Sequence, residues 1–101
     1  GAHFSLSCYE NQNLENLMEL FDWPIYALSM KGESLYESDL PKNVAIILGS
    51  EGQGLAQKLL DKSTKTIRIP MTQGIESLNV GSAASIIMYE YYRQSQLHVK
   101  A

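Results

Sequence analysis

The stretch VAIILGSEGQGL, residues 44–55, joins an apolar run to a loop that contains three glycines. Val44–Leu48 are apolar without any alternation, which is typical of a strand that is covered on both faces and therefore of a parallel sheet. Gly49, Gly52 and Gly54 follow at once. The stretch therefore predicts a buried parallel strand followed by a loop that either holds a ligand or simply turns the chain.

Apolar spacing on both sides of this stretch predicts the remaining elements. Leu14, Leu17, Met18 and Phe21 recur at helical spacing after a possible cap in Asn11–Asn13. Short strands are predicted at 25–28 and 66–69, a short helix at 55–60, and mainly loop with a helical turn at 30–43. One face of a long last helix is formed by Val80, Ala83, Ala84, Ile87, Met88 and Tyr91. This order of elements predicts an α/β fold with a parallel sheet and flanking helices.

The composition limits the class of protein. A chain of 101 residues fits one domain, and its single cysteine, Cys8, permits no disulfide within the chain, which favours a reduced, intracellular setting. No apolar run approaches the roughly 18–20 residues that a membrane-spanning helix needs. The net charge of −3 and the pI near 5.2 count against a simple electrostatic binder of nucleic acid.

The glycine loop does not fit the known phosphate-binding patterns. A P-loop needs a lysine and a hydroxyl residue after its last glycine, whereas Leu55 and Ala56 follow Gly54. The glycines run G-x-x-G-x-G rather than G-x-G-x-x-G, and Glu51 places a negative charge inside the loop. The one cysteine and two distant histidines, His3 and His98, also predict no metal site.

Three segments follow predicted strands and should meet at one edge of the sheet, because ligands of parallel α/β sheets bind beyond the carboxyl ends of the strands. They are Leu28–Ser29, the glycine loop, and IPMTQGIESLNV at residues 69–80. Backbone polar groups beside Ile69, Met71 and Leu78 suit a flat heteroaromatic group such as adenine. The alternative is that these apolar residues are plain core and that the glycines are plain turns.

Two motifs then resemble a known family. AIILGSEGQGL at 45–55 and IRIPMTQGIESLNVGSAASIIMYEYYRQ at 67–94 closely resemble the second and third motifs of the SpoU (TrmH-type) RNA ribose 2′-O-methyltransferases, which belong to the SPOUT class. GAHF at 1–4 is similar to the stretch that follows the first motif. The resemblance covers nearly the whole chain, and two motifs at this separation are highly specific.

The resemblance implies a deep trefoil knot at about residues 44–94 that binds S-adenosylmethionine. It implies methyl transfer to a ribose 2′-hydroxyl of rRNA or tRNA by a cytoplasmic homodimer in which the last helix takes part in the contact. By position it assigns three cofactor-contacting residues, Gly49, Ile69 and Leu78, with Leu28, Ser29, Gly52 and Met71 as further walls. The implied catalytic residues are Asn79, Ser77 and Glu51, although Ser77 or Asn79 could instead only cap the last helix.

One part of the family pattern is missing. The first motif carries an asparagine and an arginine that is the leading candidate for activating the ribose, and neither Arg68 nor Arg93 stands at its place. Residues 1–101 are therefore expected to be the C-terminal portion of a methyltransferase domain, truncated on its N-terminal side and inactive alone. The alternatives are a non-catalytic module for cofactor binding or dimerisation, and an RNA-binding scaffold that has lost the cofactor.

Overall fold

A computed structural model describes residues 5–10, 14–20, 22–49, 55–71 and 79–100 of the chain. The apolar pattern predicts the order helix, strand, strand, helix, strand, helix, and the structure adds a strand at the start and a 3₁₀ turn between the two consecutive strands. In chain order the elements are β1 (Ser5–Glu10), α1 (Leu14–Leu20), β2 (Ile25–Ser34), the 3₁₀ turn η1 (Leu35–Glu37), β3 (Asn43–Leu48), α2 (Gln57–Lys62), β4 (Lys65–Arg68) and α3 (Val80–Lys100).

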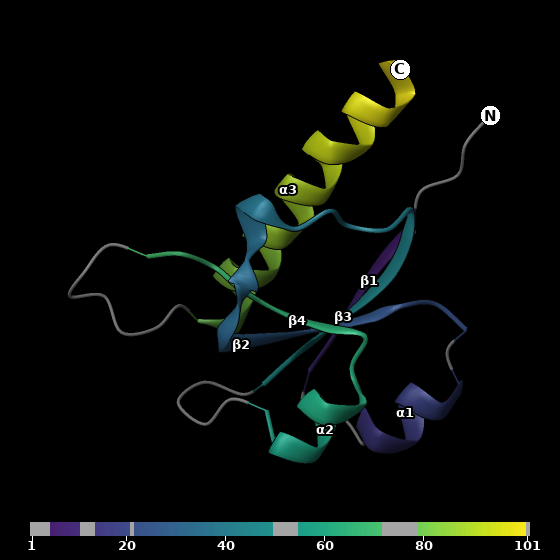
Figure 1. The fold of residues 1–101 in the computed structure, drawn as a ribbon, viewed down its shortest axis with the longest axis vertical. Helices are drawn as coiled ribbons and strands as arrows, with labels where there is room; N and C mark the ends of the chain where they lie inside the picture. Colours follow the sequence, from purple (N-terminus) through teal and green to yellow (C-terminus); the bar gives the residue numbers. More distant parts are fainter. Residues whose placement is uncertain (1–4, 11–13, 21, 50–54, 72–78, 101) are drawn as a thin grey trace.

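The four strands form one sheet in the order β1-β3-β2-β4, and every neighbouring pair is parallel. Helices α1 and α2 cover one face of the sheet, while α3 crosses the other (Figure 1). The predicted α/β class, with a parallel sheet between flanking helices, is therefore confirmed. The expected knot, about residues 44–94, includes two segments, 50–54 and 72–78, that lie outside the described residues, so the knot stays a prediction.

Strand β3 is the centre of both cores. Val44, Ile46 and Leu48 point into the cluster that includes Ala83 and Ile87 of α3. Ala45 and Ile47 alternate with them and pack with Leu14, Met18, Ile25 and Ala27 against the α1 and α2 side. All five central residues of β3 are at most 2% exposed, which explains why its sequence shows no polar alternation.

The first strand was not predicted. β1 pairs with β3 over its whole length, from Ser5 opposite Asn43 to Glu10 opposite Leu48. Leu6 and Cys8 alternate on one face, where both are half-buried against the α3-side core. Burial raises the pKa of the Cys8 thiol, so this cysteine behaves as a packing residue. β1 is an edge strand among those described, and two inward-facing residues give a weak periodic signal.

Strand β2 is longer than predicted, and the expectation that residues 30–34 are loop is wrong. Leu28 and Glu33 both lie opposite Ile67 of β4, so residues 29–32 leave the ladder as an irregular bulge before β2 rejoins β4. The predicted helical turn in this region is confirmed as η1, where the Ser34 hydroxyl accepts a hydrogen bond from the Tyr36 N–H at 3.3 Å.

The last helix is confirmed, but its buried face is rotated from the predicted one. The buried residues described in this helix are Ala83, Ile87, Glu90, Gln94 and Ser95, whereas Met88, which was expected on the buried face, is 50% exposed. α2 begins two residues later than predicted, and the predicted cap in residues 11–13 lies outside the described residues. Within the described ranges no helix has the length and hydropathy to cross a membrane.

Candidate functional site

The described parts of the three predicted site segments lie at one level of the sheet, where β3 ends, β2 bulges and β4 approaches its end. Ala27 lies opposite Ile47 of β3 on one side and opposite Thr66 of β4 on the other. Gly49 follows Ile47 by two residues, and Ile69 follows Thr66 by three, so both leave the sheet at the level of Leu28–Ser29. At about 3.3 Å per residue, all of them stand within roughly 10 Å of this shared row along the strands.

One side of this edge is apolar. Leu28 and Ile69 are half-buried against the α3-side core, and Val80, the first residue of α3, packs against the same cluster. Met71 is also half-buried, two residues beyond Ile69. Leu28, Ile69 and Val80 therefore pack against the same buried cluster. Their role as a wall for an apolar or aromatic group stays a prediction.

Two polar side chains of the described residues, Ser29 and Asn79, belong to the predicted site segments at this edge. The Ser29 hydroxyl accepts a hydrogen bond from the Lys31 N–H at 3.3 Å within the β2 bulge. Asn79 precedes α3, and its Oδ1 accepts a hydrogen bond from the Ser82 N–H at 2.7 Å, while its carbonyl accepts one from the Ala83 N–H. Asn79 is therefore the N-cap of α3. Its capping role is confirmed, and a catalytic role stays a prediction.

Four predicted site residues lie outside the described residues: Glu51, Gly52, Ser77 and Leu78. In the described ranges no three histidine, cysteine, aspartate or glutamate side chains gather as they would around a metal ion.

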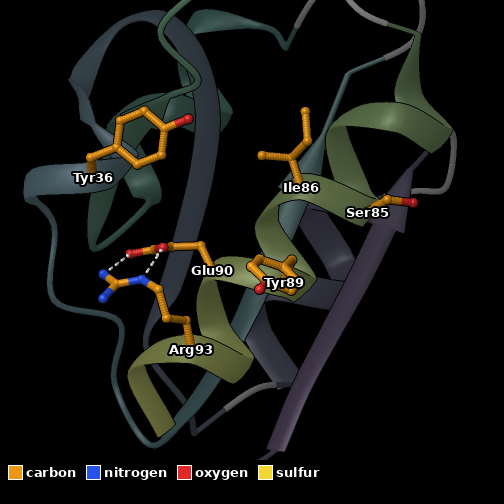
Figure 2. A pocket seen from close by; sticks show the side chains of 6 residues that line it. All are labelled: Tyr36, Ser85, Ile86, Tyr89, Glu90 and Arg93. Atoms are coloured by element: carbon orange, nitrogen blue, oxygen red, sulfur yellow. Dashed lines mark hydrogen bonds and ion pairs between the residues drawn. The ribbon is translucent and has the colours of Figure 1, made fainter. Parts of the chain in front are cut away.

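A separate hollow lies between η1 and α3. Its volume is about 520 Å³, and it is lined by Tyr36, Ser85, Ile86, Tyr89, Glu90 and Arg93 (Figure 2). None of these residues was predicted as part of a site. Tyr36 and Tyr89 are 64% and 70% exposed, so the hollow opens widely to solvent.

The charges beside this hollow are paired. Arg93 donates from Nε to Glu90 Oε1 and from Nη2 to Glu90 Oε2, both at 2.8 Å, in a two-pronged ion pair. The hydrogen bond from Arg93 is the main reason why the pKa of Glu90 is lowered, and it outweighs the opposing effect of burial. The carboxylate is therefore ionised and held in place at neutral pH.

The fold and the described part of the candidate site define a class: a parallel α/β domain in which Leu28, Gly49 and Ile69 lie at one level of the sheet, on the side where its last helix begins. The profile of the SpoU rRNA Methylase family matches residues 1–89. The chain belongs to this family, and the predicted resemblance is confirmed.

Individual relatives agree with this assignment. The chain is 32% identical over 85 residues to the 23S rRNA (guanosine-2′-O-)-methyltransferase RlmB of Bordetella pertussis (strain Tohama I / ATCC BAA-589 / NCTC 13251), covering 84% of this chain and 35% of the relative. It thus spans about a third of the length of that relative.

Solved structures share the fold. A structure from work on the 2-OH methylation of C/U34 on tRNA superposes with a TM-score of 0.74 at 31% identity, covering 82% of this chain and 56% of the other. An AdoMet-bound rRNA methyltransferase from Sinorhizobium meliloti has the same fold, with a TM-score of 0.69 at 24% identity over 82% of this chain and 33% of the other. The family profile and the relative from Bordetella pertussis thus describe rRNA methyltransferases.

Proposed function

We propose that this chain forms the cofactor-binding part of an S-adenosylmethionine-dependent methyltransferase that acts on a ribose 2′-hydroxyl of rRNA or tRNA. The observation that carries the proposal is the convergence of Leu28, Gly49 and Ile69 at one sheet edge beside the start of α3. Family membership and the RNA-modifying activity of the relatives support the same function.

The proposed binding mode uses the shape and polarity of this edge. The adenosyl group would lie against Leu28, Ile69 and Met71, where apolar surface is exposed only in part. Gly49 leaves space for the ligand to approach the backbone, since glycine has no Cβ. Ser29, Gly52 and Leu78 complete the proposed wall. In this arrangement backbone polar groups, rather than charged side chains, recognise the adenine edge.

The proposed reaction moves one methyl group. The bond between the sulfonium sulfur and the methyl carbon breaks, a bond from that carbon to the ribose 2′-oxygen forms, and S-adenosylhomocysteine remains. The hydroxyl proton must pass to a base, because a neutral hydroxyl is a poor nucleophile. We assign Asn79, Ser77 and Glu51 to this region. Because Asn79 Oδ1 caps α3, its amide N–H₂ is the group that would contact ribose or cofactor.

The chain is not expected to transfer methyl groups alone. The arginine that the resemblance places in the first motif has no counterpart here, and Arg93 is engaged by Glu90. Arg68 is exposed on β4 and is not the positional equivalent. A non-catalytic module for cofactor binding is therefore the second candidate, and it shares the proposed cofactor site.

Dimer formation is proposed through the outer face of α3. Among the described side chains of this helix, four large apolar or aromatic ones are at least half exposed: Met88, Tyr89, Tyr92 and Leu97. Apolar and aromatic groups at this density on one helix are typical of a surface that another subunit covers. Sedimentation equilibrium is expected to give twice the chain mass, and a change of Tyr92 to lysine is expected to give the single mass.

Methyl transfer can be tested with labelled cofactor. Transfer of a tritiated methyl group from S-adenosylmethionine to rRNA and tRNA would be measured for the chain and for a longer protein that supplies the first motif. A 2′-O-methyl group blocks alkaline cleavage of the adjacent phosphodiester, so the product can be mapped to ribose. We expect label on ribose only with the longer protein, and label on a base, or turnover by the chain alone, would contradict the proposal.

A further inference from the structure

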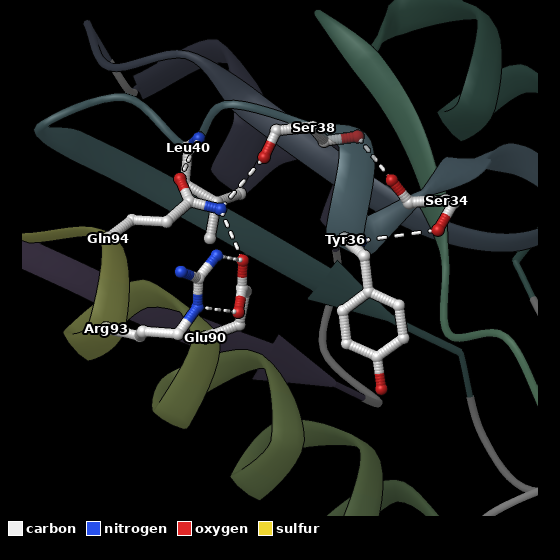
Figure 3. A network of polar contacts seen from close by, with 7 residues as sticks. All are labelled: Ser34, Tyr36, Ser38, Leu40, Glu90, Arg93 and Gln94. Carbon is white, nitrogen blue, oxygen red and sulfur yellow. Dashed lines mark hydrogen bonds and ion pairs between the residues drawn. The ribbon is translucent and has the colours of Figure 1, made fainter. Parts of the chain in front are cut away.

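The side chain of Gln94 joins the far end of α3 to the segment that enters β3. Its Oε1 accepts a hydrogen bond from the Leu40 N–H at 2.7 Å, and its Nε2 donates to the Ser38 carbonyl at 2.9 Å (Figure 3). The same Nε2 donates to Glu90 Oε2 at 2.7 Å. Gln94 is only 8% exposed, so this junction lies within the protein.

The surrounding polar groups are also satisfied. Glu90 is held by Arg93, and the Ser38 hydroxyl donates to the Ser34 carbonyl at 2.9 Å (Figure 3). In the described ranges no buried side-chain nitrogen or oxygen lacks a hydrogen-bond partner. A network that is fully satisfied favours one geometry, because any displacement leaves a buried polar group without its bond.

This junction fixes the axial position of α3. The amide of Gln94 meets one backbone donor and one backbone acceptor two residues apart, so a slide of the helix breaks both bonds. One residue of helix rises about 1.5 Å, whereas a hydrogen bond tolerates only a few tenths of an ångström. Apolar contacts of Ala83 and Ile87 are less directional and hold this register less strictly.

The two segments that Gln94 joins lead to opposite sides of the proposed cofactor site. Residues 38–40 lead into β3, which ends at Leu48 directly before Gly49, while α3 begins directly after Asn79. A helical stretch of about 22 Å separates Gln94 from Asn79 along the axis. The hydroxyl of Tyr91 also donates to the Lys42 carbonyl, one turn nearer to the site.

We propose that Gln94 is a positioning residue that sets the position of Asn79 relative to Gly49 by fixing the register of α3 against β3. For its effect on ligand affinity the inference rests on the proposed function, since it assumes that the cofactor binds between these two residues. Its effect on the position of Asn79 does not depend on that function.

The test replaces the amide by an apolar group of similar length. Gln94→Met removes all three hydrogen bonds, and Gln96→Met is the matched control because Gln96 is exposed on the same helix. Backbone amide resonances of Asn79 and Ser82 would be compared by nuclear magnetic resonance, and S-adenosylhomocysteine affinity by calorimetry. We expect these resonances to move and affinity to fall about tenfold in Gln94→Met, with neither change in Gln96→Met.

A second comparison separates positioning from stability. Met18→Ala removes a buried side chain from the core on the α1 side, away from α3, and should destabilise the chain without moving the Asn79 resonances. If Gln94→Met lowers stability but, like Met18→Ala, does not move the Asn79 and Ser82 resonances, then Gln94 contributes to stability alone and the inference is wrong. If Gln94→Met does not fold, the shorter amide in Gln94→Asn carries the same comparison.

The two ligand outcomes are distinguishable. Absence of S-adenosylhomocysteine binding by the unmodified chain would contradict the proposed function, and the resonance shifts would then decide the inference by themselves. Binding by the unmodified chain with equal affinity in Gln94→Met and Gln96→Met would overturn the role of Gln94 at the site and leave the proposed function standing.

Discussion

Gly32 lies directly against the backbone of Ile67. A Cβ atom on Gly32 would stand 2.6 Å from the Ile67 nitrogen and 2.7 Å from the Ile67 carbonyl carbon, closer than real Cβ atoms approach. The contact arises where β2 bulges away from β4 and returns to it opposite the same residue. Because Gly32 has no side chain, the backbone of β2 can lie directly against the backbone of β4 at this point, next to the proposed site.

Gly32→Ala is expected to destabilise the chain. The neighbouring atoms are backbone of a paired strand and cannot move away cheaply, so we expect a loss of roughly 1–3 kcal/mol in the free energy of unfolding, measured with urea. Gly81→Ala is the matched control: a Cβ there meets only Asn79 Oδ1 at 3.4 Å, an ordinary contact. Because alanine favours a helix more than glycine does, Gly81→Ala in α3 should raise the free energy of unfolding by about 0.5–1 kcal/mol. Equal effects of the two substitutions would contradict the account.

Two substitutions separate the capping of α3 by Asn79 from its proposed contact with ribose or cofactor. Asn79→Ala removes the acceptor for the Ser82 N–H and should cost about 1 kcal/mol of stability. Asn79→Asp keeps that acceptor and should cost far less, but it replaces the amide donor assigned to ribose or cofactor. We expect Asn79→Asp to keep the melting temperature and lose ligand affinity or methyl transfer. Unchanged affinity and transfer in Asn79→Asp would restrict Asn79 to capping.

The link between α1 and α2 should depend on pH. Glu15 accepts from Lys62 Nζ at 2.8 Å and from Lys58 Nζ at 2.9 Å. The hydrogen bond from Lys62, followed by that from Lys58, lowers the pKa of Glu15 from 4.5 to about 2. Because the pKa is lower in the folded state, this contribution is present above pH 4.5 and is lost as the pH falls toward 2.

Glu15→Gln provides the measurement. The difference in unfolding free energy between the unmodified chain and Glu15→Gln should be constant from neutral pH to about pH 5.5 and should shrink below it. Both ion pairs of Glu15 are partly exposed to solvent, so added salt should reduce the difference in unfolding free energy at neutral pH. A difference that grows on acidification would contradict the assigned ion pairs.

Removal of the Arg93 side chain should destabilise the protein, because Glu90 is then a buried carboxylate without its ion-pair partner. The Glu90 side chain is 6% exposed, and the hydrogen bond from Arg93 is the main cause of its lowered pKa. Arg93→Met therefore leaves a buried carboxylate that accepts a hydrogen bond from Gln94 but has lost those from Arg93. We expect a loss of roughly 1–3 kcal/mol at neutral pH. Since the lowered pKa belongs to the ion pair, the loss should diminish as acid protonates Glu90 in the variant. Arg68→Met, at an exposed position of β4, is the control, and equal losses would contradict the prediction.

The parts of the fold that the sequence predicts are those with dense apolar patterns. Val44–Leu48 predicts a strand covered on both faces, and the structure places its residues alternately in two cores. The rule that ligands bind beyond the carboxyl ends of parallel strands predicts that Leu28, Gly49 and Ile69 lie close to one edge of the sheet. β1 was missed because Leu6 and Cys8, the two residues of this edge strand described as packing against the core, form too short a pattern to indicate a strand.

The polar parts of the structure could not be predicted in the same way. Lys31–Glu33 has the composition of a loop, and only the approach of Gly32 to β4 shows why the strand continues there. Glu90 and Gln94 have the composition of a solvated helix face, yet they are buried. Their spacing from Ala83 and Ile87 places them on the core face, and this is the signal that would have found them.

The most direct test of the central claim is calorimetric titration of this chain with S-adenosylhomocysteine, beside Gly49→Leu. The account predicts saturable binding of one ligand per chain, and its loss in a folded Gly49→Leu chain because a leucine side chain would fill the space at the strand end. Absence of binding by the unmodified chain, with cooperative unfolding demonstrated under the same conditions, would contradict the claim that residues 1–101 hold the cofactor.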